Sequence, residues 1–158
     1  MALSQLTYYY RNKQGLFTQV IDRMIRRYLH EIEDILTSAA NPKERMALLV
    51  RYFKKLIREQ PKLLMLFIDF TAQALWVPAF RKQVDELFDS ITEMIETSIL
   101  NGSENRESLR GHSSRSLAKL ILGALYGTSV QVLLGFHQEE DMQAIHLAEN
   151  LFQKECFE

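Results

Sequence analysis

The sequence predicts an all-α protein, and three observations support this. Apolar residues recur every three or four positions along most of the 158 residues, which is the period of an amphipathic helix and not the alternation of a strand. Prolines and capping residues divide this pattern into segments of helical length. Apolar residues make up 47% and charged residues 25% of the chain, as in a globular protein large enough to form its own core.

The first long helix is expected from Asn12, a plausible N-cap, to Leu36. Between Leu16 and Leu36 the apolar residues follow the spacing of one helix face for about six turns. Charged residues occupy the other positions, so we expect that face to meet solvent.

The second helix has a clear start signal. Asn41–Glu44 places an asparagine at the N-cap, a proline at the first helical position and a glutamate at the third. One face from Met46 to Ile57 is apolar, and the other is basic. The basic face is compatible with nucleic-acid binding, but a solvated surface explains it more simply. Its members are Arg51, Lys54, Lys55 and Arg58.

The third and fourth helices are expected to begin at Pro61 and Pro78. The third, which ends near Trp76, is apolar nearly all round in the stretch 63–70, and such a helix is expected to run through the centre of the fold. The fourth should end at Asn101–Gly102, because these residues favour helix C-termini.

A polar linker is expected at 101–113, followed by a fifth helix capped by Ser113 or Ser114 and a last helix at about 139–157. The stretch 120–136 contains no charge, which raises the possibility of a membrane span, but it is short for that role and carries several polar residues and glycines. A helix covered on one side by its own subunit and on the other by a partner fits better. We therefore expect no membrane insertion.

This two-sided apolar helix predicts a homodimer in which the fifth and last helices pair with their copies as a four-helix bundle. Gly123 and Gly127 are spaced to let another helix approach closely, although two glycines alone are weak evidence. The residues expected at the interface are Leu117, Leu120, Ile121, Ala124, Thr128, Ile145, Ala148 and Phe152.

The middle helices are expected to enclose a cavity for a small apolar or amphipathic effector. The candidates are mostly aromatic, with Gln73 and Tyr126 able to orient a polar group. The alternative is that these side chains simply fill the core, and periodicity does not decide between the two. The candidates are Phe53, Met65, Phe67, Phe70, Gln73, Trp76, Phe80, Phe88 and Tyr126.

The sequence offers no sign of catalysis. It lacks nucleophile-elbow, phosphate-loop and dinucleotide motifs, and its four histidines have no metal-type spacing. We expect no enzyme activity, no metal and no cofactor. Cys156 is the only cysteine, and no leader is visible at the start, so a reducing cytoplasm is the expected location.

The N-terminal stretch Leu3–Phe17 carries three consecutive tyrosines followed by a basic, polar segment. Its hydroxyl, amide and cationic groups are suited to phosphate oxygens. Residues 1–60 also hold 11 Lys and Arg against 6 Asp and Glu, whereas the remainder holds 8 against 14. A basic front and an acidic back suit a protein that meets a polyanion at one end. The alternative is an arm whose tyrosines pack on the first long helix.

The stretch resembles the end of the DNA-binding domain in tetracycline-repressor-type (TetR) transcriptional regulators. Thr7–Tyr10 stands where the family has the aromatic cluster that ends its recognition helix, and Asn12–Lys13 where it has a turn before the next helix. Thr7 replaces the usual first tyrosine, and Tyr10 a phenylalanine. The rest of the chain is similar to the regulatory domain, most of all in the choline-responsive repressor branch. The matching segments are Tyr52–Phe53, the run through Trp76, and Gly123–Leu134.

The resemblance implies a ligand-responsive regulator, typically a repressor. Residues 1–13 would be a remnant of the helix-turn-helix domain, with the motif's first helices missing, and 14–158 the effector-binding and dimerisation domain. We expect this polypeptide to dimerise but to bind operator DNA only when the missing helices are restored. The alternative is a helical dimerisation or small-molecule-binding module without a DNA function. The residues that the resemblance assigns to DNA are Gln5, Thr7, Tyr8, Tyr9 and Lys13.

Overall fold

The computed structural model describes residues 3–100, 112–135 and 138–157, together with their side chains apart from those of 3–14, 17, 138–141 and 155. Every element in these ranges is helical, so the all-α prediction is confirmed. The elements are α1 (Leu3–Ser38), α2 (Pro42–Glu59), α3 (Pro61–Ala74), α4 (Pro78–Ile95), the π-helical turn η1 (Glu96–Leu100), α5 (Ser114–Leu134) and α6 (Gln138–Phe157).

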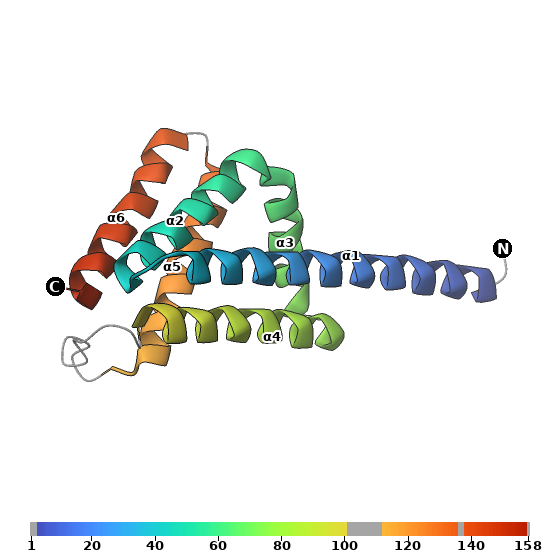
Figure 1. The fold of residues 1–158 in the computed structure, drawn as a ribbon. Helices are drawn as coiled ribbons and strands as arrows, with labels where there is room; N and C mark the ends of the chain where they lie inside the picture. Colours follow the sequence, from blue (N-terminus) through green and yellow to red (C-terminus); the bar gives the residue numbers. More distant parts are fainter. Residues whose placement is uncertain (1–2, 101–111, 136–137, 158) are drawn as a thin grey trace.

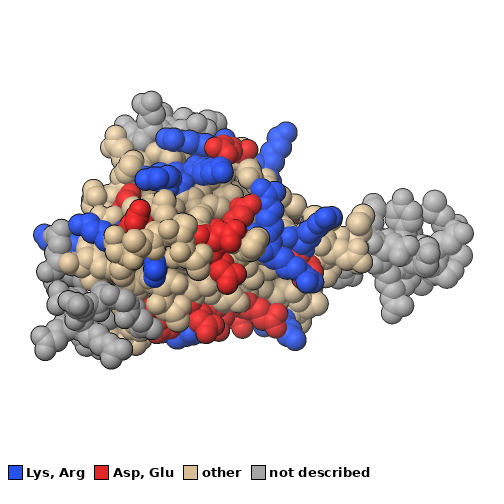
Figure 2. All heavy atoms as spheres, viewed as in Figure 1, with Lys and Arg blue, Asp and Glu red and all other residues tan. Residues whose placement is uncertain are grey.

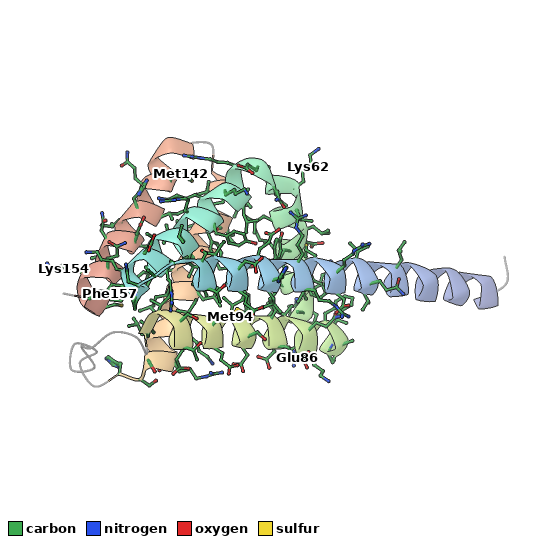
Figure 3. All side chains as sticks on the ribbon, in the orientation of Figure 1. Lys62, Glu86, Met94, Met142, Lys154 and Phe157 are labelled. Atoms are coloured by element: carbon green, nitrogen blue, oxygen red, sulfur yellow. The ribbon has the colours of Figure 1, made fainter. Side chains whose placement is uncertain are left out.

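The helices pack around α1, which crosses the whole body and extends beyond it at its N-terminal end (Figure 1). α1 packs between α2 and α4, while α5 contacts α2, α4 and α6. α3 stands at the edge where α1 leaves the body (Figure 1). The interior is one apolar core to which all six α-helices contribute. Lys62 and Glu86 point away from this core into solvent (Figure 3).

α1 is longer than the sequence predicted. It runs without a break from Leu3 to Ser38, so the expected turn at Asn12–Lys13 is wrong. The segment contains no proline and a single glycine, Gly15, and one glycine costs a helix only about 1 kcal/mol. Such a cost is too small to end a helix that continues on both sides. Among the side chains that the structure describes, Ile21 is the first buried one.

The helix starts agree with the capping signals. The side chain of Asn41 accepts a hydrogen bond from the backbone N–H of Glu44 at 2.9 Å, and the Glu44 carboxylate accepts one from the Ala40 N–H at 3.3 Å. Ser113 caps α5 by accepting from the Ser116 N–H at 3.2 Å. Pro61 and Pro78 begin α3 and α4. These contacts satisfy N–H groups that a helix start leaves without partners.

α3 does not run through the centre of the fold. Its buried residues, Leu64, Phe67, Phe70 and Ala74, form one side only. Met65 is 48% exposed, and just beyond the helix Leu75 and Trp76 are 69% and 84% exposed. The prediction failed because a helix that is apolar all round gives no indication of which side faces water.

A π-helical turn, η1, ends the fourth helix, where the sequence predicted a regular helix. Such turns place one extra residue in a helix and disturb its backbone hydrogen bonds. Arg45 from α2 reaches this point: its Nη1 donates to the Ser98 carbonyl at 2.8 Å, and its Nε donates to the Ala39 carbonyl at 3.1 Å. One guanidinium thus joins the α1–α2 connection to η1.

A partly buried polar contact joins α1 to α2. The Tyr52 hydroxyl donates to Glu31 Oε2 at 2.8 Å, and Arg27 Nε donates to Glu31 Oε1 at 2.6 Å. Burial, followed by the Glu31 hydrogen bond, raises the pKa of Tyr52. Burial alone would raise the pKa of Glu31, but the bonds from Arg27 and Tyr52 outweigh it and lower that pKa. Lys, Arg, Asp and Glu alternate over the visible face where these helices lie (Figure 2).

Candidate functional site

An apolar face shared by α5 and α6 is the most distinctive surface among the described residues. Leu120 and Leu134 on α5 are 60% and 76% exposed, and Leu147 and Leu151 on α6 are 60% and 53% exposed. The residue spacings place each pair on one side of its helix. α5 and α6 pack against each other, and we call the outward sides that carry these four leucines the α5–α6 face.

Two glycines open the middle of this face. Gly127 lies one heptad after Leu120 and one before Leu134, so it shares their side of α5, and Gly123 lies one turn earlier. A Cβ atom added at either glycine would meet no heavy atom within 4 Å. The backbone of α5 is therefore open to close approach by another helix here.

The residues predicted for the interface separate into three groups. Leu120 lies in the α5–α6 face. Ile121 and Ile145 are fully buried inside the subunit, so they belong to its own core and have no surface to offer a partner. The reason is that α5 has apolar residues on all sides, and the side that turned inward contains Ile121, Leu122 and Leu125. The remaining predicted residues are half-buried: Leu117, Ala124, Thr128, Ala148 and Phe152.

α5 is also the one helix, within the described ranges, that is long and apolar enough to cross a membrane. In its most apolar window 33% of the residues are buried inside the chain. The inward side of this helix is therefore occupied by the protein's own core, and its outward side is the α5–α6 face.

A groove lies between α4 and α5, with a volume of about 290 Å³. Both helices contribute residues at positions i, i+3, i+4 and i+7, which is the pattern of one helix side facing a cleft. We call it the α4–α5 groove. It is lined by Asp85, Phe88, Asp89 and Thr92 from α4 and by Lys119, Leu122, Gly123 and Tyr126 from α5.

Aromatic rings form the inner wall of this groove. The ring centroids of Phe88 and Tyr126 are 5.6 Å apart at an interplanar angle of 68°. Phe67 on α3 lies behind both, at 6.2 Å from Phe88 and 6.1 Å from Tyr126, and Tyr28 of α1 lies 6.0 Å from Phe67. These edge-to-face contacts fix the rings against one another. The wall is therefore shaped before any ligand arrives.

The Tyr126 hydroxyl is fixed as well. It lies 2.5 Å from Thr71 Oγ1, which donates its own proton to the Ile68 carbonyl at 2.7 Å. A hydroxyl has one proton, so Tyr126 must donate in this pair. Burial raises the pKa of Tyr126. At neutral pH the phenol remains protonated.

The rim of the groove carries charges of both signs. Arg115 of α5 pairs with Asp89 and lies 3.5 Å from Glu96 Oε2. Asp85 and Lys119 form no ion pair with any residue that the structure describes. An apolar, aromatic wall with an acidic and a basic side chain at its rim is suited to a small amphipathic molecule.

Only some of the predicted pocket residues reach this groove. Phe88 and Tyr126 line it, and Phe67 supports them from behind. Phe70 and Phe80 pair in the core with ring centroids 5.0 Å apart. Phe70 and Phe80 therefore fill the core, as the alternative to a ligand cavity predicted.

The other predicted pocket residues lie elsewhere. Phe53 is buried beside Tyr52, and Gln73 Nε2 donates to Asp69 at 2.9 Å within α3. Trp76 is exposed at the corner between α3 and α4. Met65 lines a separate groove, of about 540 Å³, formed mainly by residues of α2, α3, α5 and α6. The nine candidates therefore do not surround one cavity among the described residues.

The residues assigned to DNA by resemblance lie in the projecting part of α1. Their backbone is helical, but the side chains of Gln5, Thr7, Tyr8, Tyr9 and Lys13 fall outside the described residues. Their role stays a prediction.

One contact that the sequence did not indicate positions α6. Lys54 Nζ on α2 lies 2.8 Å from His146 Nδ1 and 3.7 Å from Glu149 Oε2, both on α6. An ammonium group only donates, so the imidazole nitrogen accepts. Burial lowers the pKa of Lys54, and Glu149 opposes that shift. This cluster holds α6 against α2, so His146 and Glu149 are on the side of α6 that meets α2.

Among the described residues, no group of three His, Cys, Asp or Glu side chains is placed to hold a metal ion. Cys156 is buried in the core. Comparison with models of protein families, with curated proteins and with solved structures finds no match.

Proposed function

We propose that this chain is the effector-binding and dimerisation part of a TetR-type transcriptional regulator and that it acts as a homodimer. The observation that carries the proposal is the α5–α6 face, with four large leucines more than half exposed on two adjacent helices. Apolar surface of this kind is rare on monomers and marks a docking site. The N-terminal resemblance supplies the regulatory part of the proposal.

A second copy of the chain is the occupant that fits the face best. The exposed part of α5 from Leu120 to Leu134 has no charged residue, so a charged partner surface would lose hydration there without compensation. The face combines large leucines with glycines and alanines, which provides both protrusions and recesses for a two-fold interface. Two helices from each copy then form a four-helix bundle.

Analytical ultracentrifugation tests the dimer. We expect wild-type protein to sediment as a dimer at micromolar concentration, and the double variant Leu120→Glu, Leu151→Glu to be a folded monomer. Leu75→Glu is the matched control, because Leu75 is also more than half exposed but lies at the α3–α4 corner. A monomeric wild type, or a double variant that still dimerises, contradicts the proposal. Flotation of the wild type with lipid vesicles, lost in the double variant, would instead assign the face to a membrane.

The α4–α5 groove is the proposed effector site, for a small apolar or amphipathic molecule. Its preformed aromatic wall supports this proposal. Gly123→Leu fills the groove from a position where the added carbon meets open space. We expect thermal-shift screening to find ligands that stabilise the wild type and leave Gly123→Leu unaffected. Ligands that stabilise both proteins equally would exclude this groove.

DNA binding is tested with the chain extended by the sequence that precedes it in its gene. We propose that the extended protein binds a palindromic site, with Lys13→Ala weakening binding and reducing its salt dependence by about one charge. Dimerisation and ligand binding without any sequence-specific DNA binding by the extended protein would favour the alternative, a binding module with no DNA function.

A further inference from the structure

The α4–α5 groove and the α5–α6 face share a residue. Gly123 lines the groove, and it is exposed on the side of α5 that carries Leu120 and Gly127. At about 100° per residue, Gly123 lies about 60° from Leu120 and about 40° from Gly127 around the helix axis. The groove therefore opens directly beside the apolar face.

We propose that the α4–α5 groove is a composite site whose outer wall is supplied by a second copy of the chain. This inference rests on the proposed dimer. A helix that packs on another covers an arc of about 100° or more. A partner helix centred on Leu120 and Gly127 therefore reaches Gly123, and the rim at Lys119 lies about 40° farther around the helix axis.

Two features of α5 favour such a close approach. Neither Gly123 nor Gly127 has a side chain. A Cβ atom added at either position would meet no other heavy atom of the same subunit within 4 Å. Where glycines meet, helix axes come closer than with larger residues. Side chains of the partner then extend past Gly123 towards Phe88 and Tyr126, which form the inner wall.

The surfaces that line the composite site indicate which chemical groups its ligand carries. Its apolar part packs between the aromatic wall of one copy and the apolar face of the other, and its polar part meets Asp85 or Lys119 at the rim. Such a ligand binds the dimer better than the monomer. By linkage, the ligand strengthens dimerisation by the same factor by which dimerisation strengthens ligand binding.

A fluorescent reporter tests the composite site without any ligand. The double variant Phe88→Trp, Trp76→Phe places the only tryptophan in the groove, since Trp76 is the single native one. When the protein is diluted until the dimer dissociates, we expect the tryptophan emission to shift to the red. The protein concentration at the midpoint of this shift should equal the midpoint of dissociation measured by sedimentation. In the wild type the exposed Trp76 serves as the control, and its emission should not change.

The outcomes separate the two proposals. If sedimentation shows dissociation while the groove tryptophan does not respond, the composite site is wrong and the dimer stands. If the wild type shows no dimer at micromolar concentration, the proposed function itself fails, and the composite site with it.

A second measurement avoids changing the aromatic wall. Asp85→Cys places a thiol at the exposed rim, and the one native cysteine, Cys156, is buried and gives a low background. We expect a maleimide to react severalfold more slowly with the dimer than with the monomeric variant that also carries Leu120→Glu and Leu151→Glu. Equal rates would overturn the composite site.

Discussion

α2 and α5 are of similar length and both bury one side in the same core, but their outer sides differ. α2 buries residues from Met46 to Ile57 and turns basic side chains outward. α5 buries residues from Ala118 to Val132 and turns leucine and glycine outward. The comparison shows that a charged side marks the direction of water, and that a helix without one leaves apolar side chains exposed. Among the described residues, α5 and α6 together carry four leucines that are more than half exposed.

The largest expected contrast between the two helices is in the cost of removing a leucine. Leu49→Ala on α2 empties a fully buried position and should lower the free energy of unfolding by about 3 kcal/mol. Leu120→Ala on α5 should cost the monomer less than about 1 kcal/mol, because that side chain is exposed. Urea denaturation below the dimer dissociation constant measures both. Equal losses would mean that Leu120 packs inside the subunit.

The polar contact between α1 and α2 gives the next largest effect. Tyr52→Phe removes a hydrogen bond to a carboxylate and should cost about 1.5 kcal/mol at neutral pH. Since the folded state lowers the pKa of Glu31, its contribution is present above about pH 4.5 and is lost as the pH falls towards the lowered pKa. We expect stability to fall less steeply with acid in Glu31→Gln than in the wild type. A parallel pH dependence in the two proteins would refute this.

The two helices should respond equally to loss of their caps. Asn41→Ala at α2 and Ser113→Ala at α5 each remove one side-chain bond to a backbone N–H near the helix start, worth about 1 kcal/mol. Thermal unfolding measures the loss. A much smaller effect at Ser113 would show that the start of α5 is held by other contacts, such as the bond from Ser114 to Glu96 at 2.6 Å.

The smallest effect should change sign with the association state. Gly127→Ala adds a methyl group in open space within a helix, which should stabilise the monomer by up to about 1 kcal/mol. The same methyl group should weaken the dimer if the partner approaches at Gly127. Denaturation at low concentration and sedimentation equilibrium measure the two changes. Stronger dimerisation of the variant would show that the partner helix lies away from this glycine.

The comparison also explains what the sequence could predict. α2 was placed correctly because Asn41, Pro42 and the basic positions define both its start and its outer side. For α3 and α5 the helices were found, but the inward sides were not: Trp76 lies in solvent and Ile121 in the core. The α4–α5 groove depends on which two helices lie together. Periodicity within either helix carries no information about that, so only Phe88 and Tyr126 were anticipated.

The length of α1 has a mechanical consequence. Between Leu3 and Ile21, the first buried side chain among those that the structure describes, the helix is about 27 Å long at about 1.5 Å per residue. A tilt of the packed half by about 5° would displace the far end by about 2 Å, because the rod acts as a lever whose fulcrum is the contact with α2 and α4. Small repacking inside the bundle is thereby amplified at the tip. Anything attached to that tip moves farther than the side chains that cause the motion.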